Sequence, residues 1–270
     1  MREASVGFQC PECVAEGRRT QRAPQTAFGA QAGAGVRGYA TTFLIGLNVL
    51  AMVVVVAKGG MAALFSGGLF GSETVVHCQG ALLSAAKVRF ADGPCAGMIL
   101  TGVDGGAYYR LFTSMFLHYG ALHLLMNMYA LWILGRNLEI AFGPVRFVTL
   151  YLLAGLGGSV ASYLFAAPTA LTAGASGAVF GLFSALFIAL KRLKRDTSSV
   201  IPIIVVNLLF TFAVPGISIS GHLGGLVTGA LAGLGLAYAP PKYRTPVQIA
   251  VVGGLFVVLA LITLAVSTSR

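Results

Sequence analysis

The sequence predicts an all-α protein, a polytopic bundle of helices that crosses a membrane several times. Of its 270 residues, 57% are hydrophobic and 10% are charged, and its mean hydropathy is +0.85. Soluble domains carry about 25% charged residues, and the apolar residues of this chain fall in long runs. A membrane-spanning helix needs about 20 mainly apolar residues. Seven runs approach that length: 40–57, 118–135, 147–167, 175–190, 200–215, 222–239 and 247–267.

The placement of the positive charges predicts the orientation of these helices. The net charge is +10, and basic residues precede the first run and follow the second, fourth and sixth, whereas the links 168–174 and 216–221 carry no charge. Cytoplasmic loops are rich in Lys and Arg. We therefore expect a multi-pass protein of the cell (plasma) membrane with a cytoplasmic N-terminus. The basic cluster at 191–195 is interpreted as an anchor at the lipid surface and not as a nucleic-acid site.

The runs divide the chain into a polar cytoplasmic tail (1–38), a six-helix core (39–240) and an extra C-terminal transmembrane helix (241–270). The tail, expected to be mobile, contains Cys10 and Cys13 in a Cys-Pro-Glu-Cys motif, which is half of a zinc knuckle. A structural zinc site needs four ligands, so two plain thiols are favoured. Zinc completed by ligands from another chain or from upstream residues is the alternative, and catalysis is expected to need no cofactor.

A long link, residues 58–117, joins the first two runs on the outer side. It is too long for a turn and too apolar for a solvated linker, and links of this kind usually have a function. It contains Cys78 and Cys95. A disulfide is permitted outside the cytoplasm, but the sequence leaves open whether these two cysteines are paired.

Polar residues recur at the outer ends of three predicted helices. Alternating helix directions place His118 and His123 of the second run, Ser176 of the fourth and His222 of the sixth within one or two turns of the outer surface. Polar side chains at membrane depth are costly and mark candidate functional sites. His123 and Asn127 share one helix face through their i, i+4 spacing. The alternative for this pair is hydrogen bonding between neighbouring helices.

Ser176 lies in a Gly-Ala-Ser-Gly motif, residues 174–177. Gly174 permits a sharp turn and a close approach of the backbone. Ser176 then falls in the first helical turn, where unpaired N–H groups favour a negative charge and can stabilise an oxyanion. The alternative is a packing surface of small residues, which Gly177 and Gly181 extend.

His222 begins a row with Gly225 and Gly229 on one helix face. This row lets the helix that carries Ser176 approach closely, so that the two side chains can meet. A neutral imidazole can take the proton of a serine hydroxyl near pH 7. No Asp or Glu lies at this depth, so a Ser–His dyad is predicted, with Phe180 as the surface against which the imidazole rests.

Taken together, these motifs resemble the rhomboid family of intramembrane serine proteases. The Gly-x-Ser-Gly at 174–177, the Gly-His-x-x-Gly-x-x-x-Gly at 221–229 and the His-x-x-x-Asn at 123–127 occur in the family's order. Tyr109-Arg110 is similar to the family's Trp-Arg motif, with Tyr replacing Trp. The resemblance covers roughly residues 40–240 and implies a rhomboid-like six-helix core with a seventh helix added.

The resemblance implies a role for each matching residue. Ser176 is expected to be the nucleophile and His222 the general base and acid, with His123, Asn127 and the Ser176 backbone N–H as oxyanion donors. Arg110 and Glu139 match structural polar residues of the family, and Phe180 stands where some members carry Tyr. The residues expected to support the site are His118, Tyr109, Arg110, Glu139, Phe180, Gly174, Gly177 and Gly225.

The predicted function is therefore cleavage of transmembrane segments of membrane proteins near the outer face. One alternative is a rhomboid-like protein that binds membrane clients without cutting them, which loss of Ser176 or His222 would have favoured. A transporter that relays protons is another alternative, but it predicts polar residues through the full membrane thickness. The uncharged stretch 210–219 is a candidate gate for sideways entry of substrate.

Overall fold

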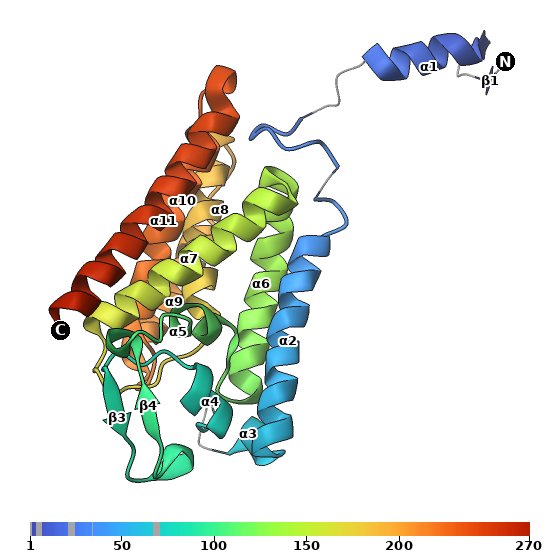
Figure 1. Cartoon of the computed structure of the whole chain (residues 1–270). Coiled ribbons are helices and arrows are strands. Elements are labelled where there is room, and N and C mark those ends of the chain that lie inside the picture. The colour runs from blue at the N-terminus through green and yellow to red at the C-terminus, as the bar shows by residue number, and fades with distance from the viewer. Residues whose placement is uncertain (1, 4–6, 21–24, 34, 67–70) are drawn as a thin grey trace.

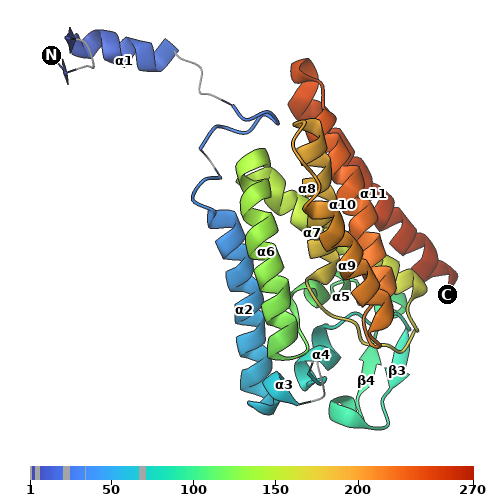
Figure 2. The same cartoon turned by 180° about the vertical axis from the view of Figure 1, so that it is seen from behind.

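The computed structural model describes residues 2, 3, 7–20, 25–33, 35–66 and 71–270. Among these residues, seven long helices form a bundle, and each overlaps one of the predicted runs (Figures 1 and 2). The all-α membrane bundle is therefore confirmed. The long helices are α2 (Tyr39–Gly59), α6 (Gly120–Phe142), α7 (Pro144–Phe165), α8 (Ser176–Arg192), α9 (Val200–Ala213), α10 (Ile219–Tyr238) and α11 (Arg244–Ser269).

Four of the described helices are long and apolar enough to cross a membrane by length and composition: α2, α7, α10 and the helical segment Pro241–Ser269, which contains α11. Helix α8 has 17 residues and α9 has 14, whereas α6 has 23 residues but carries polar side chains that lower its mean hydropathy. With several such helices packed in one bundle, the chain is an integral multi-pass membrane protein.

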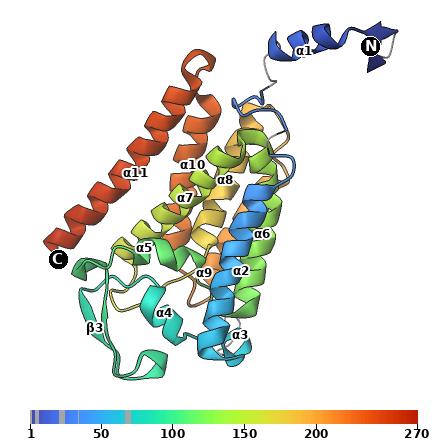
Figure 3. The same ribbon diagram turned by 45° about the vertical axis from the view of Figure 1, so that its right-hand side comes forward.

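The helices alternate in direction, so the N-terminal ends of α6, α8 and α10 gather at the end of the bundle that also carries the long outer link (Figures 1 and 3). The N-terminal tail lies at the opposite end. Helix α10 packs along both α7 and α8, which also contact each other. These three helices form the centre of the bundle and position the residues at its outer-link end.

The link between α6 and α7 is shorter than the runs 118–135 and 147–167 predict, because they leave residues 136–146, which begin with Arg136 and end with Arg146, between the helices. Helix α6 extends to Phe142 and α7 starts at Pro144, so both arginines lie inside helices. The connection is Gly143 alone, at φ +81°, a conformation that glycine adopts without steric cost.

Glu139, near the end of α6, caps the N-terminus of α2. Its carboxylate accepts hydrogen bonds from the backbone N–H groups of Ala40 (3.0 Å) and Thr41 (2.9 Å) and from the Thr41 hydroxyl (2.7 Å). Glu139 is fully buried. The first N–H groups of a helix have no partner within it, so this carboxylate fastens α2 to α6 and acts as a structural residue.

The outer link between α2 and α6 is folded. Its elements are α3 (Ala62–Phe65), α4 (Val75–Gly80), β3 (Lys87–Arg89), β4 (Ile99–Thr101), α5 (Arg110–Thr113) and short 3-10 turns at Gly93–Cys95, Val103–Gly105 and Ser114–Phe116. Strands β3 and β4 pair antiparallel. A disulfide joins Cys78 to Cys95, which resolves the pairing that the sequence left open.

Arg110 and Tyr109 hold separate segments of this link together. The Arg110 guanidinium donates hydrogen bonds to the carbonyls of Cys78, Ala81 and Thr101 at 2.7–2.8 Å, and the Tyr109 hydroxyl donates to the Gln79 carbonyl at 3.1 Å. The tyrosine that replaces tryptophan in the Tyr-Arg motif therefore joins α4 to the start of α5 within the link.

The tail is only partly as expected. Strands β1 (Arg2–Glu3) and β2 (Phe8–Gln9) and helix α1 (Pro11–Thr20) lie beyond the bundle (Figure 1), with Cys10 and Cys13 exposed as free thiols. The expectation of a mobile tail is wrong for the segment 25–31, because Phe28 is 2% exposed and packs on Phe142. No group of three metal-binding side chains occurs among the described residues.

Candidate active site

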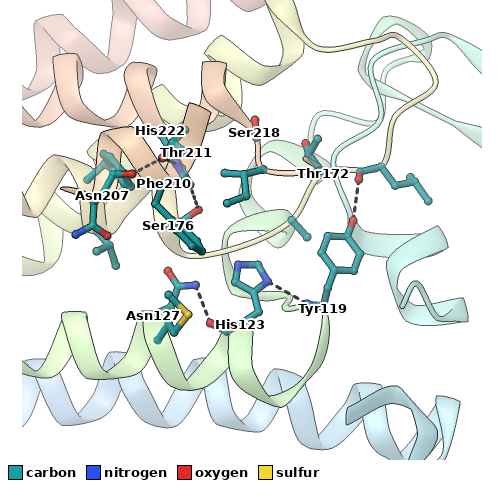
Figure 4. A pocket seen from close by; sticks show the side chains of 17 residues that line it. Tyr119, His123, Asn127, Thr172, Ser176, Asn207, Phe210, Thr211, Ser218 and His222 are labelled. Atoms are coloured by element: carbon teal, nitrogen blue, oxygen red, sulfur yellow. Dashed lines mark hydrogen bonds between the residues drawn. The ribbon is translucent and has the colours of Figure 1, made fainter. Parts of the chain in front are cut away.

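Ser176 and His222 meet at the outer-link end of the bundle. Ser176 is the first residue of α8 and His222 is the fourth residue of α10. The Ser176 Oγ atom lies 2.7 Å from His222 Nε2 (Figure 4). The predicted contact between a hydroxyl from one helix and an imidazole from another is therefore present, at hydrogen-bond distance.

Glycines on both helices permit this approach. Gly177 and Gly181 of α8 face Gly225 and Gly229 of α10, and a Cβ atom at Gly229 would lie 2.3 Å from the Gly181 Cα atom. Real Cβ atoms do not come so close to a backbone. The sequence offered two interpretations of this motif, a packing surface of small residues and a functional site at Ser176. The geometry is compatible with both.

Two groups orient the His222 imidazole. One face of the ring stacks on Phe180, as predicted, with ring centroids 4.2 Å apart and planes inclined by 16°. The Nδ1 atom lies 2.8 Å from the Thr211 hydroxyl on α9. Sequence reasoning missed Thr211, although Asn207 and Thr211 are the two polar residues of an otherwise apolar helix and share a face by their i, i+4 spacing.

His123 and Asn127 line a cavity beside Ser176 (Figure 4). The backbone N–H of Tyr119 donates to His123 Nδ1 at 3.2 Å, so a neutral His123 carries its proton on Nε2. Asn127 donates an amide hydrogen to the His123 carbonyl at 2.9 Å. Gly174, at φ +144°, lets the chain pass His123, because a Cβ there would lie 2.9 Å from its Nε2.

His118 supports the backbone next to Ser176. It is fully buried, and its Nδ1 is 3.2 Å from the Phe116 carbonyl, to which it donates. Its Nε2 accepts a long hydrogen bond from Ala175 N–H at 3.5 Å. The ring therefore holds the residue that precedes Ser176.

His77 of the outer link supports His118 in turn. The sequence did not predict this role. Its Nδ1 accepts from the Thr74 backbone N–H at 3.2 Å, and its Nε2 lies 3.2 Å from the His118 carbonyl. Its ring stacks on Tyr119 at 4.5 Å. Burial lowers the pKa of His77 to about 4 and lowers the pKa of His118 well below its usual value. Both rings are therefore neutral at pH 7.

The outer link and Tyr119, at the start of α6, also hold the loop that leads to Ser176. Leu82 and Thr172 exchange two backbone hydrogen bonds of 2.8 and 3.0 Å, and the Tyr119 hydroxyl donates to the Leu171 carbonyl at 2.8 Å. The position of Ser176 therefore depends on the folded outer link as well as on α8.

Two cavities adjoin Ser176. The larger, of about 140 Å³, lies between α6, α8 and α9. The smaller, of about 40 Å³, lies behind Ser176 and is large enough for ordered water, which needs about 10–15 Å³. Tyr109, Arg110 and Glu139 line neither cavity. The hydroxyl-bearing residues of the smaller cavity, apart from Ser176, are Ser114, Ser159, Ser162, Thr172 and Ser218.

Known proteins share these elements. A family model described as "Rhomboid domain" matches residues 105–239. The chain is 45% identical over 141 residues to Rhomboid protease GluP of Bacillus subtilis (strain 168). The matched stretch covers 50% of this chain and 27% of that protein. It is 38% identical over 145 residues to RHOMBOID-like protein 6, mitochondrial, of Arabidopsis thaliana, covering 51% of this chain and 47% of that protein.

A third relative is matched over more of its own length. The chain is 33% identical over 135 residues to YdcA of Bacillus subtilis (strain 168), covering 48% of this chain and 68% of that protein. It spans less than half the length of GluP and RHOMBOID-like protein 6. The family model covers half of the chain and includes the helices that carry His123, Ser176 and His222. The chain therefore belongs to the rhomboid family.

Proposed function

We propose that this protein is an intramembrane serine endopeptidase that cleaves transmembrane segments of other membrane proteins near the outer membrane face. The observation that carries the proposal is the 2.7 Å contact between Ser176 Oγ and His222 Nε2 beside a cavity in the bundle. A serine hydroxyl becomes an effective nucleophile when an adjacent base accepts its proton. The relatives named as rhomboid proteases support this reaction class.

In the proposed reaction, His222 Nε2 takes the Ser176 proton as Oγ attacks the carbonyl carbon of the scissile peptide. The tetrahedral intermediate collapses when His222 returns that proton to the leaving amine, which leaves an acyl-enzyme on Ser176. A water molecule then attacks the ester with His222 again as base, releasing the second product and restoring the serine. None of these steps requires a cofactor.

The carbonyl oxygen that becomes negatively charged needs donors close to Ser176. His123 and Asn127 line the same cavity as Ser176. Ser176 lies at the first position of α8, where backbone N–H groups have no partner within the helix. We assign the oxyanion donors to the His123 Nε2–H, the Asn127 amide and the Ser176 backbone N–H.

Hydrolysis inside a membrane requires a supply of water. The 40 Å³ cavity behind Ser176 is lined by hydroxyls that can each hydrogen-bond to water. It also includes Ser176 and His222, so water held there is next to the ester that must be hydrolysed. This cavity supports a hydrolase in preference to a protein that only binds.

The substrate is proposed to enter sideways between α6 and α9, where the larger cavity lies. The uncharged segment 210–219, which contains the end of α9, is the proposed gate. A transmembrane helix must unwind locally before its carbonyl is reachable, because its backbone hydrogen bonds are satisfied internally. The basic residues at the opposite end of the bundle favour a cytoplasmic N-terminus and a site near the outer face of the plasma membrane.

The test is cleavage of a transmembrane substrate by the full chain in detergent, with Ser176→Ala and His222→Ala as comparisons. We expect cleavage by the wild type only, and labelling of Ser176 by a fluorophosphonate probe. Equal cleavage by either variant contradicts the proposal. Substrate capture without cleavage by the wild type indicates the alternative, a rhomboid-like binder of membrane clients.

A further inference from the structure

We propose that Thr211 is a positioning residue that holds His222 in the tautomer required of a general base. This inference rests on the proposed protease function. It starts from the 2.8 Å contact between Thr211 Oγ1 and His222 Nδ1, on the side of the imidazole away from Ser176 (Figure 4).

The hydrogen bonds of Thr211 decide which atom donates in this contact. The Thr211 hydroxyl has one hydrogen, and its Oγ1 lies 2.8 Å from the Asn207 carbonyl, which can only accept. With that hydrogen given to Asn207, Oγ1 offers a lone pair to His222. Nδ1 must then carry the imidazole proton, and Nε2 is left unprotonated to accept the Ser176 proton.

The opposite tautomer is unproductive. A proton on Nε2 would point at Ser176 Oγ and prevent His222 from acting as its base. In proteases with a Ser-His-Asp triad, a carboxylate bound to Nδ1 excludes that tautomer, and its loss lowers the rate by about 10⁴-fold. Besides His222, the titratable side chains that line the cavity are Tyr119 and His123. Neither of them carries a carboxylate that could accept from Nδ1. The Thr211 hydroxyl occupies the place of the missing acceptor.

The same contact serves the protonated base. When His222 has taken the Ser176 proton, both ring nitrogens are donors, and Oγ1 continues to accept from Nδ1. Phe180 restrains the plane of the ring by stacking but offers no acceptor for an N–H. Phe180 therefore orients the His222 ring by packing, and Thr211 orients it by hydrogen bonding.

The location of Thr211 links the base to α9. Most of α9 is exposed on the bundle surface, and its two buried residues are Val200, at its start, and Thr211, which is 2% exposed. Movement of the C-terminal half of α9 away from α10 would remove the acceptor from His222. The orientation of His222 thus depends on α9 staying packed next to α10.

The test compares Thr211→Val, which keeps the shape and removes the hydroxyl, with Thr211→Ser, which keeps the hydroxyl. The matched control is Thr263→Val on α11. Thr263 is also buried and also donates to the carbonyl four residues earlier, that of Leu259, but it lies outside both cavities. Cleavage kinetics are measured for each variant with the same transmembrane substrate.

General-base catalysis contributes about 10²–10⁴-fold. Thr211→Val should lose only part of this contribution, because a mixture of tautomers still contains the productive one. We expect kcat to fall by about 10- to 100-fold. KM should change little, because substrate binding does not involve Nδ1. Thr211→Ser should retain most of the activity, and Thr263→Val should match the wild type. Wild-type kcat in Thr211→Val, or equal losses in Thr211→Ser and Thr211→Val, would overturn the inference.

A second measurement does not depend on cleavage. Long-range ¹⁵N–¹H spectra of the chain with ¹⁵N-labelled histidine report the tautomer of His222, assigned by its loss in His222→Ala. We expect the proton on Nδ1 in the wild type and a mixture of tautomers in Thr211→Val. A wild-type proton on Nε2 overturns the inference without any variant. If the wild type cleaves nothing, the proposed function fails, while this spectrum still decides the role of Thr211.

Discussion

The backbones of Gly177 and Gly225 are in contact: a Cβ atom at Gly225 would lie 1.9 Å from the Gly177 carbonyl oxygen. Gly225→Ala must therefore push α10 away from α8 and lengthen the contact between Ser176 and His222. Overpacking of this kind costs about 1–3 kcal/mol. We expect a lower Tm and a loss of cleavage of at least about tenfold, because a base must lie within hydrogen-bond reach of its proton.

Gly253→Ala on α11 is the matched control. No atom lies within 4 Å of a Cβ placed there, and replacing a glycine inside a helix by alanine adds about 0.5–1 kcal/mol of stability. Cleavage by this variant should equal that of the wild type. Equal cleavage by Gly225→Ala and Gly253→Ala would show that the close approach of α8 and α10 is not needed for the site.

The disulfide between Cys78 and Cys95 makes the outer link sensitive to reductant. It closes a loop with a sequence separation of 17, and a disulfide contributes about 2–4 kcal/mol. The Tm of the wild type in detergent should therefore fall on reduction. The double variant Cys78→Ser, Cys95→Ser should begin at the lower Tm and show no response to reductant.

Cys10→Ser with Cys13→Ser provides the comparison for this measurement, because both thiols are exposed and free. This variant should respond to reductant as the wild type does. A wild-type Tm that reductant leaves unchanged would contradict a stabilising role for the disulfide.

Glu139→Gln tests the cap on α2. The carboxylate accepts from three donors on Ala40 and Thr41, whereas an amide has one oxygen to accept with and an NH₂ that faces those same donors. A buried donor left without a partner costs about 1–3 kcal/mol. We expect a lower Tm with the dyad geometry intact. Glu12→Gln on the exposed α1 is the control and should leave the Tm unchanged; equal Tm values for the two variants would argue against the cap.

The long helices and the pair Ser176–His222 were predictable because a bilayer makes polar residues rare and their positions informative. Alternating helix directions then fixed which polar residues share a depth. Phe180 followed from its place one turn from Ser176. These inferences need only helix periodicity and chain direction, which the sequence carries directly.

Thr211 and His77 could not be placed in the same way. A threonine in an apolar helix ordinarily bonds to its own backbone, so only the tertiary contact with His222 distinguishes Thr211. The position of His77 depends on the fold of the outer link, which lacks helical periodicity. The packing of Phe28 on the bundle was missed because one aromatic residue in a polar tail forms no pattern. The short turn at Gly143 was missed because α6 continues through charged residues.

The stability of the outer link should depend on pH through His77. Burial holds its folded pKa at about 4, below the unperturbed value of about 6.5. Between these values the unfolded chain binds the proton and the folded chain does not, so stability rises with pH across this window. The full contribution is present above about pH 6.5 and is lost as the pH falls toward 4. We expect the Tm in detergent, at a fixed scan rate, to fall accordingly.

His77→Gln isolates this contribution. A glutamine can accept from Thr74 and donate to the His118 carbonyl, as the neutral imidazole does, but it does not titrate. The fall in Tm between pH 7 and 5 should therefore be smaller in His77→Gln than in the wild type. It should not vanish, because burial also lowers the pKa of His118. Equal acid sensitivity of the two proteins would mean that His77 does not titrate on unfolding, and that the outer link is not what acid destabilises.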